Sequence, residues 1–190
     1  AKIMARKPHV YMVQEANVCE AEIPLIKAQA SEGGYFVTFS CPTPLAKDGV
    51  SRMGRRLAIL VRLPGVPYEV ANIADRSCTY LMQSGRWAEC FIPTTDGSKH
   101  FGAGNLYGHA GASTNDQLRK LNEILLKCAL ARLGSFNDVP YFLGTDLNMD
   151  PDTSQVIECA KKDGLVYDLV NEWTPADEVP LGTYKSGGVN

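Results

Sequence analysis

The sequence predicts an α/β fold of the α+β kind, with β-sheets that are partly antiparallel and covered on both faces. Several runs are apolar with little alternation, which is typical of strands buried on both sides. Residues 95–98 (TDGS) have the composition of a hairpin turn between two such runs. From Tyr35 to Tyr107 helical patterns are almost absent, whereas a parallel doubly wound sheet needs a helix after nearly every strand.

The expected elements follow one another along the chain. Apolar, β-branched and aromatic content predicts strands at 9–16, 35–40, 56–62, 86–93, 100–107 and 139–147. Helical composition and its breakers predict helices at 20–31, 115–133 and 153–162. In the second helix, leucines at helical spacing form one apolar face, Thr114 with Gln117 matches a capping box, and Gly134 is the expected end. Residues 42–49, which contain two prolines and a glycine, predict a loop.

Length and composition favour a single soluble domain spanning residues 1–190. Hydrophobic residues make up 45% of the 190 and charged residues 21%, as in ordinary globular proteins. No apolar run approaches the roughly 20 residues that cross a bilayer. The six cysteines form no Cys-x-x-Cys pair, which favours reduced thiols in an intracellular protein, nuclear or cytoplasmic. No obligate protein partner is evident.

The net charge of −2 and pI of about 5.9 restrict how the protein could bind nucleic acid. Proteins that grip many phosphates are usually basic, so a nucleic-acid substrate would need a local basic patch. The best candidate is SRMGRR, which contains Arg52, Arg55 and Arg56. The alternative interpretation of this stretch is a solvated loop before a strand.

The stretch VPYFLGTDLNMDP brings an apolar run directly to Asp146, Asn148 and Asp150. One interpretation is a strand followed by an Asx-rich turn. A calcium-binding EF-hand loop is excluded, because Pro151 and Ile157 occupy the positions where it needs Gly and Glu. A third interpretation is a strand that ends in a functional site.

Glu15 also follows an apolar strand, in VYMVQEA. Asp146 and Asn148 are two residues apart, so they project to the same side of a strand. Two strand ends of this kind are expected to converge at one edge of a sheet. Mg²⁺ prefers hard oxygen ligands and takes one or two carboxylates with water and substrate, and a nearby Asp can orient or deprotonate a water for attack on phosphorus.

Five stretches in order resemble the endonuclease/exonuclease/phosphatase superfamily. MVQEA resembles its Gln-Glu motif, RRLAILVR an apolar strand, and GNLYGHAG the strand that ends in Tyr107. FLGTDLNMDP resembles the Gly-Asp-x-Asn motif with Thr145 inserted, and LGTYKSGGVN the Thr-Trp/Tyr segment before a further Asp. The resemblance implies two mostly antiparallel β-sheets packed face to face with helices on the outside.

The resemblance also implies Mg²⁺-dependent hydrolysis of a phosphoester, with Mn²⁺ as an alternative metal. Glu15 would hold the metal, Asp146 would align the attacking water, and Asn148 and Tyr107 would contact the phosphate. Arg55 and Arg56 would bind substrate. His109, in a Gly-rich loop, is expected to be exposed and idle.

The family's first-strand Asn and its terminal Asp and Ser-Asp-His motif have no counterpart among the 190 residues. We therefore expect a domain trimmed at both ends, which by itself hydrolyses phosphodiesters poorly. For the substrate, the short spacing from Tyr107 to Asp146 and the compact loops resemble the retroelement branch of the family, which implies a DNA endonuclease. The alternatives are an inositol-phosphate or phospholipid phosphodiesterase of the same superfamily, and a non-catalytic domain that only binds.

Overall fold

The computed structural model describes residues 7–47, 50–64, 66–67, 76–94, 97–136 and 139–167. The chain divides into two units, residues 1–150 and 151–190. The described part of the second unit holds the 3₁₀ turn η2 (Pro151–Thr153) and the helix α5 (Gln155–Lys162), whose first turn is capped by the Ser154 hydroxyl. The first unit contains the three β-sheets and the remaining described helices, so the predicted α+β class is confirmed.

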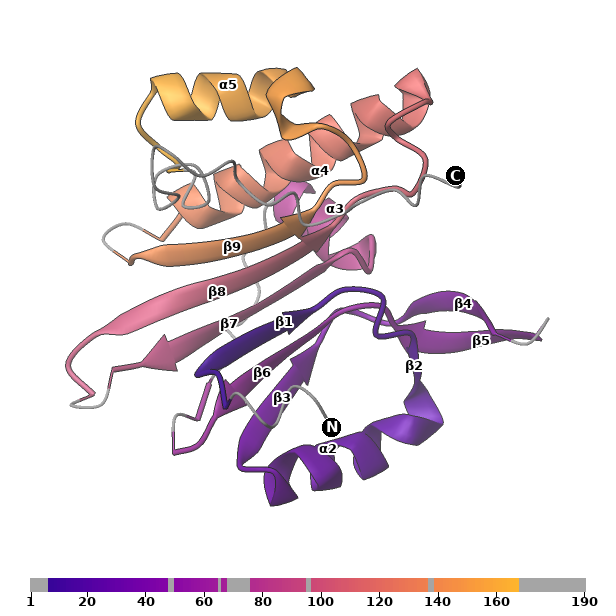
Figure 1. Cartoon of the computed structure of the whole chain (residues 1–190), viewed down its shortest axis with the longest axis vertical. Helices are drawn as coiled ribbons and strands as arrows, with labels where there is room; N and C mark the ends of the chain where they lie inside the picture. Colours follow the sequence, from indigo (N-terminus) through magenta and orange to yellow (C-terminus); the bar gives the residue numbers. More distant parts are fainter. Residues whose placement is uncertain are drawn as a thin grey trace, which may run out of the picture. The chain divides into compact units, whose positions relative to one another are not determined.

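Two three-stranded sheets form the body of the first unit (Figure 1). The first is antiparallel throughout, in the order β1 (Val10–Val13), β6 (Ala58–Arg62) and β3 (Tyr35–Phe39). In the second, an antiparallel pair is followed by a parallel one, in the order β7 (Trp87–Pro93), β8 (His100–Tyr107) and β9 (Tyr141–Asp146). A small third sheet joins β2 (Val18–Cys19), β5 (Val50–Arg55) and β4 (Thr43–Lys47).

The two larger sheets pack face to face, as expected. Alternate residues along β6 and β7 point into the space between them and meet in one buried cluster with side chains of β8. Its members are Leu57, Ile59, Val61, Ala88, Cys90, Ile92, Ala103 and Tyr107. The intervening residues of β7 are buried too, because helices cover the other face. This explains why the run WAECFIP shows no polar alternation.

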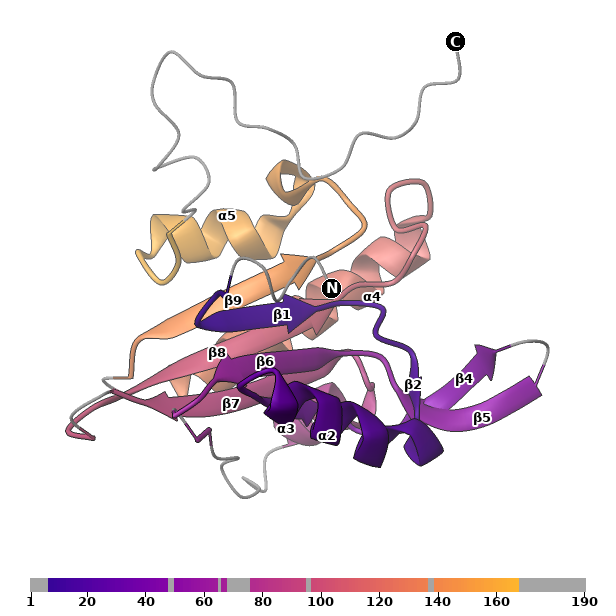
Figure 2. The ribbon, with the colours of Figure 1, turned by 60° about the horizontal axis from the view of Figure 1, so that its bottom comes forward.

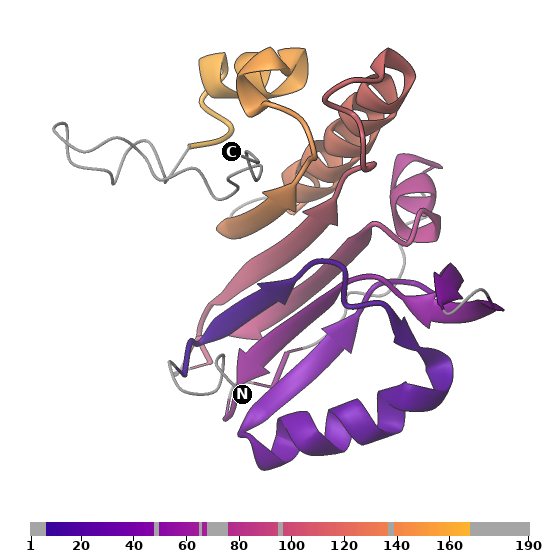
Figure 3. The same ribbon diagram turned by 45° about the vertical axis from the view of Figure 1, so that its right-hand side comes forward.

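Helices cover the outer faces of both sheets, as Figures 2 and 3 show. On the first sheet, α2 (Ile23–Glu32) buries Ala30 against Tyr35 and Val37. On the second, α4 (Asp116–Gly134) reaches β7 through an ion pair between Arg132 and Glu89. The helix α3 (Arg76–Gln83) packs against α4 and β7.

The structure differs from the sequence predictions at three places. β4 and β5 pair as antiparallel strands where a loop was expected, and the eight-residue α3 lies in a region where helical patterns were almost absent. The cap of α4 is Asn115, whose side-chain oxygen accepts from two backbone N–H groups, rather than Thr114. At its other end, Gly134 is the last residue of the helix, as expected. The motif LGTYKSGGVN and half of the turn at 95–98 lie outside the described residues.

Candidate active site

Three strands that carry predicted site residues end on the same side of the first unit (Figure 1). The parallel register of β8 and β9 places Tyr107 directly beside Asp146. The ladder continues one step further, because the Gly108 N–H donates to the Asp146 carbonyl at 2.7 Å. The backbone pairing therefore brings together two predicted residues from different motifs.

The Tyr107 hydroxyl lies at the centre of the candidate site. It donates a hydrogen bond to the Glu15 carboxylate, and it also hydrogen-bonds with the Asn148 side chain. Burial, the hydrogen bond to Glu15 and the negative charges of Glu15 and Asp146 raise the pKa of Tyr107 to about 12, although Asn148 lowers it. Tyr107 is therefore a neutral donor at physiological pH, and Glu15, Asp146 and Asn148 surround it.

Backbone strain is concentrated at two of these residues. Glu15 has a φ of +53° and Asn148 a φ of +52°, in the left-handed region. Asn tolerates this conformation, since its short side chain bonds locally, and here the Asn148 N–H donates to the Asp146 carboxylate at 3.1 Å. Glu has no such compensation, so Glu15 costs roughly 1–3 kcal/mol of strain. The surrounding structure must hold it in place.

Asn105 fixes the end of β1 against β8 and was not predicted from the sequence. Its side chain is fully buried, and its amide N–H₂ donates to the carbonyls of Val13 and Ala58 at 3.0 and 3.1 Å. Its oxygen accepts from Gln14 at 2.8 Å. These bonds join the two sheets immediately before Glu15, and they explain how a residue of one sheet meets the Tyr107 hydroxyl of the other. An Asn inside the apolar run HFGAGNLY was the available signal.

A cationic group lies on the other side of Tyr107. The Arg86 guanidinium donates to the Gly108 carbonyl at 2.6 Å and lies 5.5 Å from the centre of the Tyr107 ring. Burial and the charge of Arg56 lower the pKa of Arg86. The pKa of His109 is lowered by burial and by the charges of Arg86 and Arg56. His109 is therefore half-buried and within electrostatic range of two arginines, and not exposed as expected.

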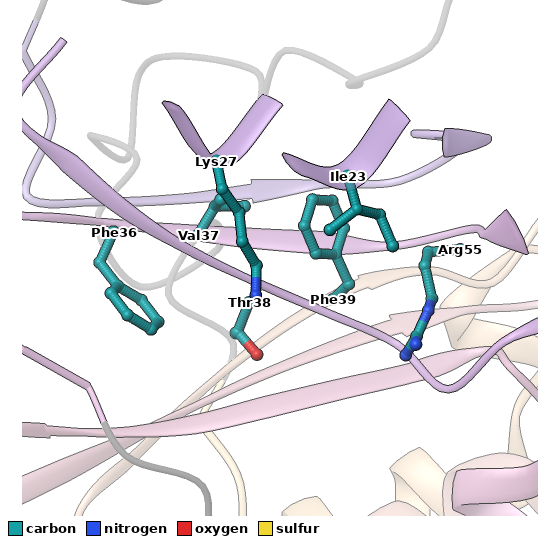
Figure 4. Close-up of a pocket in the computed structure, with 7 residues that line it drawn as sticks. All are labelled: Ile23, Lys27, Phe36, Val37, Thr38, Phe39 and Arg55. Carbon is teal, nitrogen blue, oxygen red and sulfur yellow. The ribbon is translucent and has the colours of Figure 1, made fainter. Parts of the chain in front are cut away.

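The structure separates the two arginines predicted to bind substrate. Arg56 contributes its charge to the Arg86–His109 group, while its guanidinium donates to the Pro44 carbonyl at 3.4 Å. Arg55 is paired with Glu20 at 2.7 Å and donates to the Ser40 carbonyl. Arg55 lines a cavity of about 260 Å³ between α2 and β3, together with Lys27 (Figure 4). None of the residues around Tyr107 lines this cavity. The side chain of Arg52 lies outside the described set.

The donors around Tyr107 fit a divalent cation of the Mg²⁺ type. Glu15 is solvent-exposed, and two carboxylates and an amide supply hard oxygens. Among the described residues, no group of three or more His, Cys, Asp and Glu side chains is arranged to hold a metal ion. The soft, nitrogen- and sulfur-rich donor set of a structural zinc site is likewise not found in the described part of the chain.

The arrangement of sheets and helices is similar to that of several solved structures, which share the fold at low sequence identity. Human Nocturnin, in a structure of its catalytic domain with a bound sulfate anion, aligns with 93% of this chain at a TM-score of 0.66 and 15% identity. Beta toxin from Staphylococcus aureus aligns with 88% at a TM-score of 0.51 and 14% identity.

ANGEL2, a 2',3'-cyclic phosphatase in complex with adenosine-2',3'-vanadate, aligns with 77% at a TM-score of 0.50 and 14% identity. The chain spans 64%, 62% and 42% of the Nocturnin, beta-toxin and ANGEL2 chains.

No family model matches the sequence, and no curated protein matches it. No described helix has the length and apolarity needed to cross a membrane.

Proposed function

We propose that this chain carries the catalytic residues of a divalent-metal-dependent phosphoester hydrolase. The observation that supports this most strongly is the meeting of Glu15, Asn148 and Asp146 around the Tyr107 hydroxyl, from strands of two different sheets. Glu15, which follows β1, adds a left-handed backbone and a solvent-exposed carboxylate. An Asx-rich turn after β9 alone would explain Asp146 and Asn148 but not these features of Glu15.

Each residue has a role that follows from its chemistry. Glu15 would hold Mg²⁺, or Mn²⁺ as an alternative, and the bound ion would neutralise charge on the phosphoryl oxygens. Asp146 accepts a hydrogen bond from the attacking water and aligns it. Tyr107 remains protonated because its pKa is about 12. Its single O–H donates to Glu15 in this structure and would turn to a phosphoryl oxygen when Glu15 holds the metal, and the Asn148 amide can donate to the same group.

The positive charges are placed to attract an anionic substrate. Arg86 is held by backbone carbonyls beside Tyr107, and Arg56 lies close enough to lower the pKa of both Arg86 and His109. We therefore assign substrate attraction to Arg56 and not to Arg55, whose charge is already paired with Glu20.

For the substrate we retain a nucleic-acid phosphodiester, with a DNA endonuclease of retroelement type as the specific hypothesis. The sulfate in Nocturnin and the adenosine-2',3'-vanadate in ANGEL2 are analogues of phosphate groups, and the second contains a nucleoside. They support phosphoester chemistry on this fold. An inositol-phosphate or phospholipid phosphodiesterase is the alternative within the same chemistry.

The test is hydrolysis by the full-length natural protein with and without Mg²⁺. Supercoiled plasmid, single-stranded RNA, a 2',3'-cyclic nucleotide, an inositol phosphate and sphingomyelin cover the alternatives. Asp146→Asn is nearly isosteric but loses the carboxylate that aligns the water, so hydrolysis is expected to fall roughly 10²–10⁴-fold. Asp116→Asn, an exposed carboxylate paired with Arg119 on α4, is the matched control and should retain wild-type activity.

Two results would contradict the proposal. Unchanged Mg²⁺-dependent hydrolysis by Asp146→Asn would make Asp146 a turn residue only. Absence of hydrolysis with every substrate, in the presence of Mg²⁺ or Mn²⁺, would favour a non-catalytic domain.

A further inference from the structure

We infer that Asn122, on the interior face of α4, is a positioning residue that holds the loops after β8 and β9 in register at the active site. The inference rests on the proposed function, because these two loops carry the residues assigned to hydrolysis. Asn122 lies outside the group around Tyr107 and acts on it through the backbone.

Asn122 uses both ends of its amide to join the two loops. The side chain is fully buried. Its oxygen accepts from the backbone N–H of His109 at 2.7 Å, and its nitrogen donates to the carbonyl of Leu147 at 2.6 Å. His109 follows Tyr107 by two residues, and Leu147 lies between Asp146 and Asn148. One side chain therefore connects the segments that carry Tyr107, Asp146 and Asn148, three of the four residues assigned to hydrolysis.

The packing around this bridge allows little displacement. A Cβ added to Gly108 would lie 2.5 Å from the Leu147 carbonyl oxygen and 2.8 Å from the Asn122 nitrogen, distances that real Cβ atoms do not show. Leu147 and Met149 are buried, whereas Asp146 is exposed. In the loop after β9, buried apolar residues thus alternate with more exposed polar residues. Asn122 bonds to the carbonyl of Leu147, the first of the buried residues.

A structural explanation alone does not account for a polar residue at this position. Asn122 falls on the apolar face of α4, four residues after Leu118 and three before Leu125. Asn is a poorer helix former than Leu, and burial of its amide stabilises the protein only because both ends are bonded. Its two partners are the backbone groups of the site-bearing loops, so its effect is exerted at the site.

Replacement of Asn122 by Leu would leave a buried N–H and a buried carbonyl without partners. Each unpaired group carries a desolvation penalty, so the two loops are expected to move until these groups find water. A shift of about 1 Å in catalytic groups can cost roughly 10²-fold in rate. Arg56, to which substrate attraction is assigned, bonds to Pro44 outside these loops, so the loss should fall on kcat more than on KM.

The experiment compares Asn122→Leu with Leu126→Ala in the full-length natural protein. Leu126 is a buried residue of the same helix, so its truncation provides a control for loss of stability, which urea denaturation measures for both. Under conditions where both variants are folded, Asn122→Leu should lower kcat by about 10²-fold with little change in KM. Leu126→Ala should retain kcat near that of the wild type.

Backbone amide hydrogen exchange supplies a readout that does not depend on activity. The His109 amide should lose protection in Asn122→Leu beyond what its global stability explains, and should keep it in Leu126→Ala. Unchanged His109 protection would overturn the inference, even if the wild type proved inactive and the proposed function failed. An active wild type with equal kcat in both variants would overturn the inference and leave the proposed function intact.

Discussion

Two glutamates of this chain meet opposite environments. Glu89 on β7 is 8% exposed, and its carboxylate accepts from Arg132 at 2.5 Å and from the Trp87 indole at 2.9 Å. Glu15 after β1 is exposed, its backbone is left-handed, and its partner is the neutral Tyr107 phenol. The salt bridges found among the described residues do not include Glu15.

The difference separates a carboxylate that stabilises the fold from one that remains available to a ligand. A phenol donates a hydrogen bond but does not neutralise charge, so Glu15 keeps its capacity to bind a cation. Arg132, by contrast, neutralises Glu89, and although burial lowers the pKa of Arg132, the hydrogen bond and charge of Glu89 give it a net rise. The Arg132 guanidinium therefore remains ionised in the interior.

The largest effect is expected from breaking the Glu89 pair. Arg132→Met leaves a buried, uncompensated carboxylate, which should lower the free energy of unfolding by about 3–5 kcal/mol. The double variant Glu89→Gln/Arg132→Met removes both charges, keeps an acceptor for Trp87, and should recover most of that loss. Urea denaturation of the three proteins measures it. If the free energy of unfolding of Arg132→Met lay within about 1 kcal/mol of the wild-type value, which is the range of an exposed ion pair, the pair would be solvated.

An effect on metal binding and not on stability is expected at Glu15. Glu15→Gln keeps an oxygen that accepts from Tyr107 but removes the charge, so affinity for Mn²⁺ should fall at least roughly tenfold, because carboxylate charge sets affinity at oxygen sites. Free Mn²⁺ is measured by electron paramagnetic resonance on the 190-residue chain. Glu20→Gln, which removes the partner of Arg55, is the control and should bind as the wild type does. Equal Mn²⁺ affinity in both variants would remove Glu15 from the metal site.

The smallest effect concerns pH and His109. Burial and then the charges of Arg86 and Arg56 lower its pKa below the unfolded value of about 6.5. As pH falls below 6.5, the unfolded chain takes up a proton that the native state resists, so stability decreases, and above 6.5 the contribution vanishes. The decrease between pH 7.5 and 5.5 should be smaller in His109→Gln than in the wild type. An NMR titration that gives His109 a pKa of 6.5 or higher would contradict this prediction.

The sequence identified the strand ends well, because an apolar run that stops at a carboxylate is a local pattern. Tyr107 and Asp146 each mark the last residue of a strand that was predicted from composition. The α+β class followed from the same runs. The pairing of β4 with β5 was not predicted, because Pro44 indicated a loop. In the structure Pro44 lies in β4, at the edge of the small sheet, where proline is tolerated.

The supporting residues could not be predicted, because their roles depend on partners distant in sequence. Asn105 bonds to Val13 and Ala58, and Asn122 to His109 and Leu147. In both cases the sequence shows only a polar residue on an apolar face. Arg55 and Arg56 are neighbours in the chain, yet Arg55 is paired with Glu20, 35 residues away, and Arg56 adds its charge to the Arg86–His109 group.

The parallel pairing of β8 with β9 has a consequence for the order in which the protein folds. The β7–β8 hairpin closes through a short turn, whereas parallel strands need a crossover, here the whole of α4. Closing that longer loop carries the larger entropic cost, and nonlocal pairings form slowly. We expect Tyr107 to be in place before Asp146 arrives beside it, so that in a nascent chain the β7–β8 pair forms first and the candidate active site is completed last.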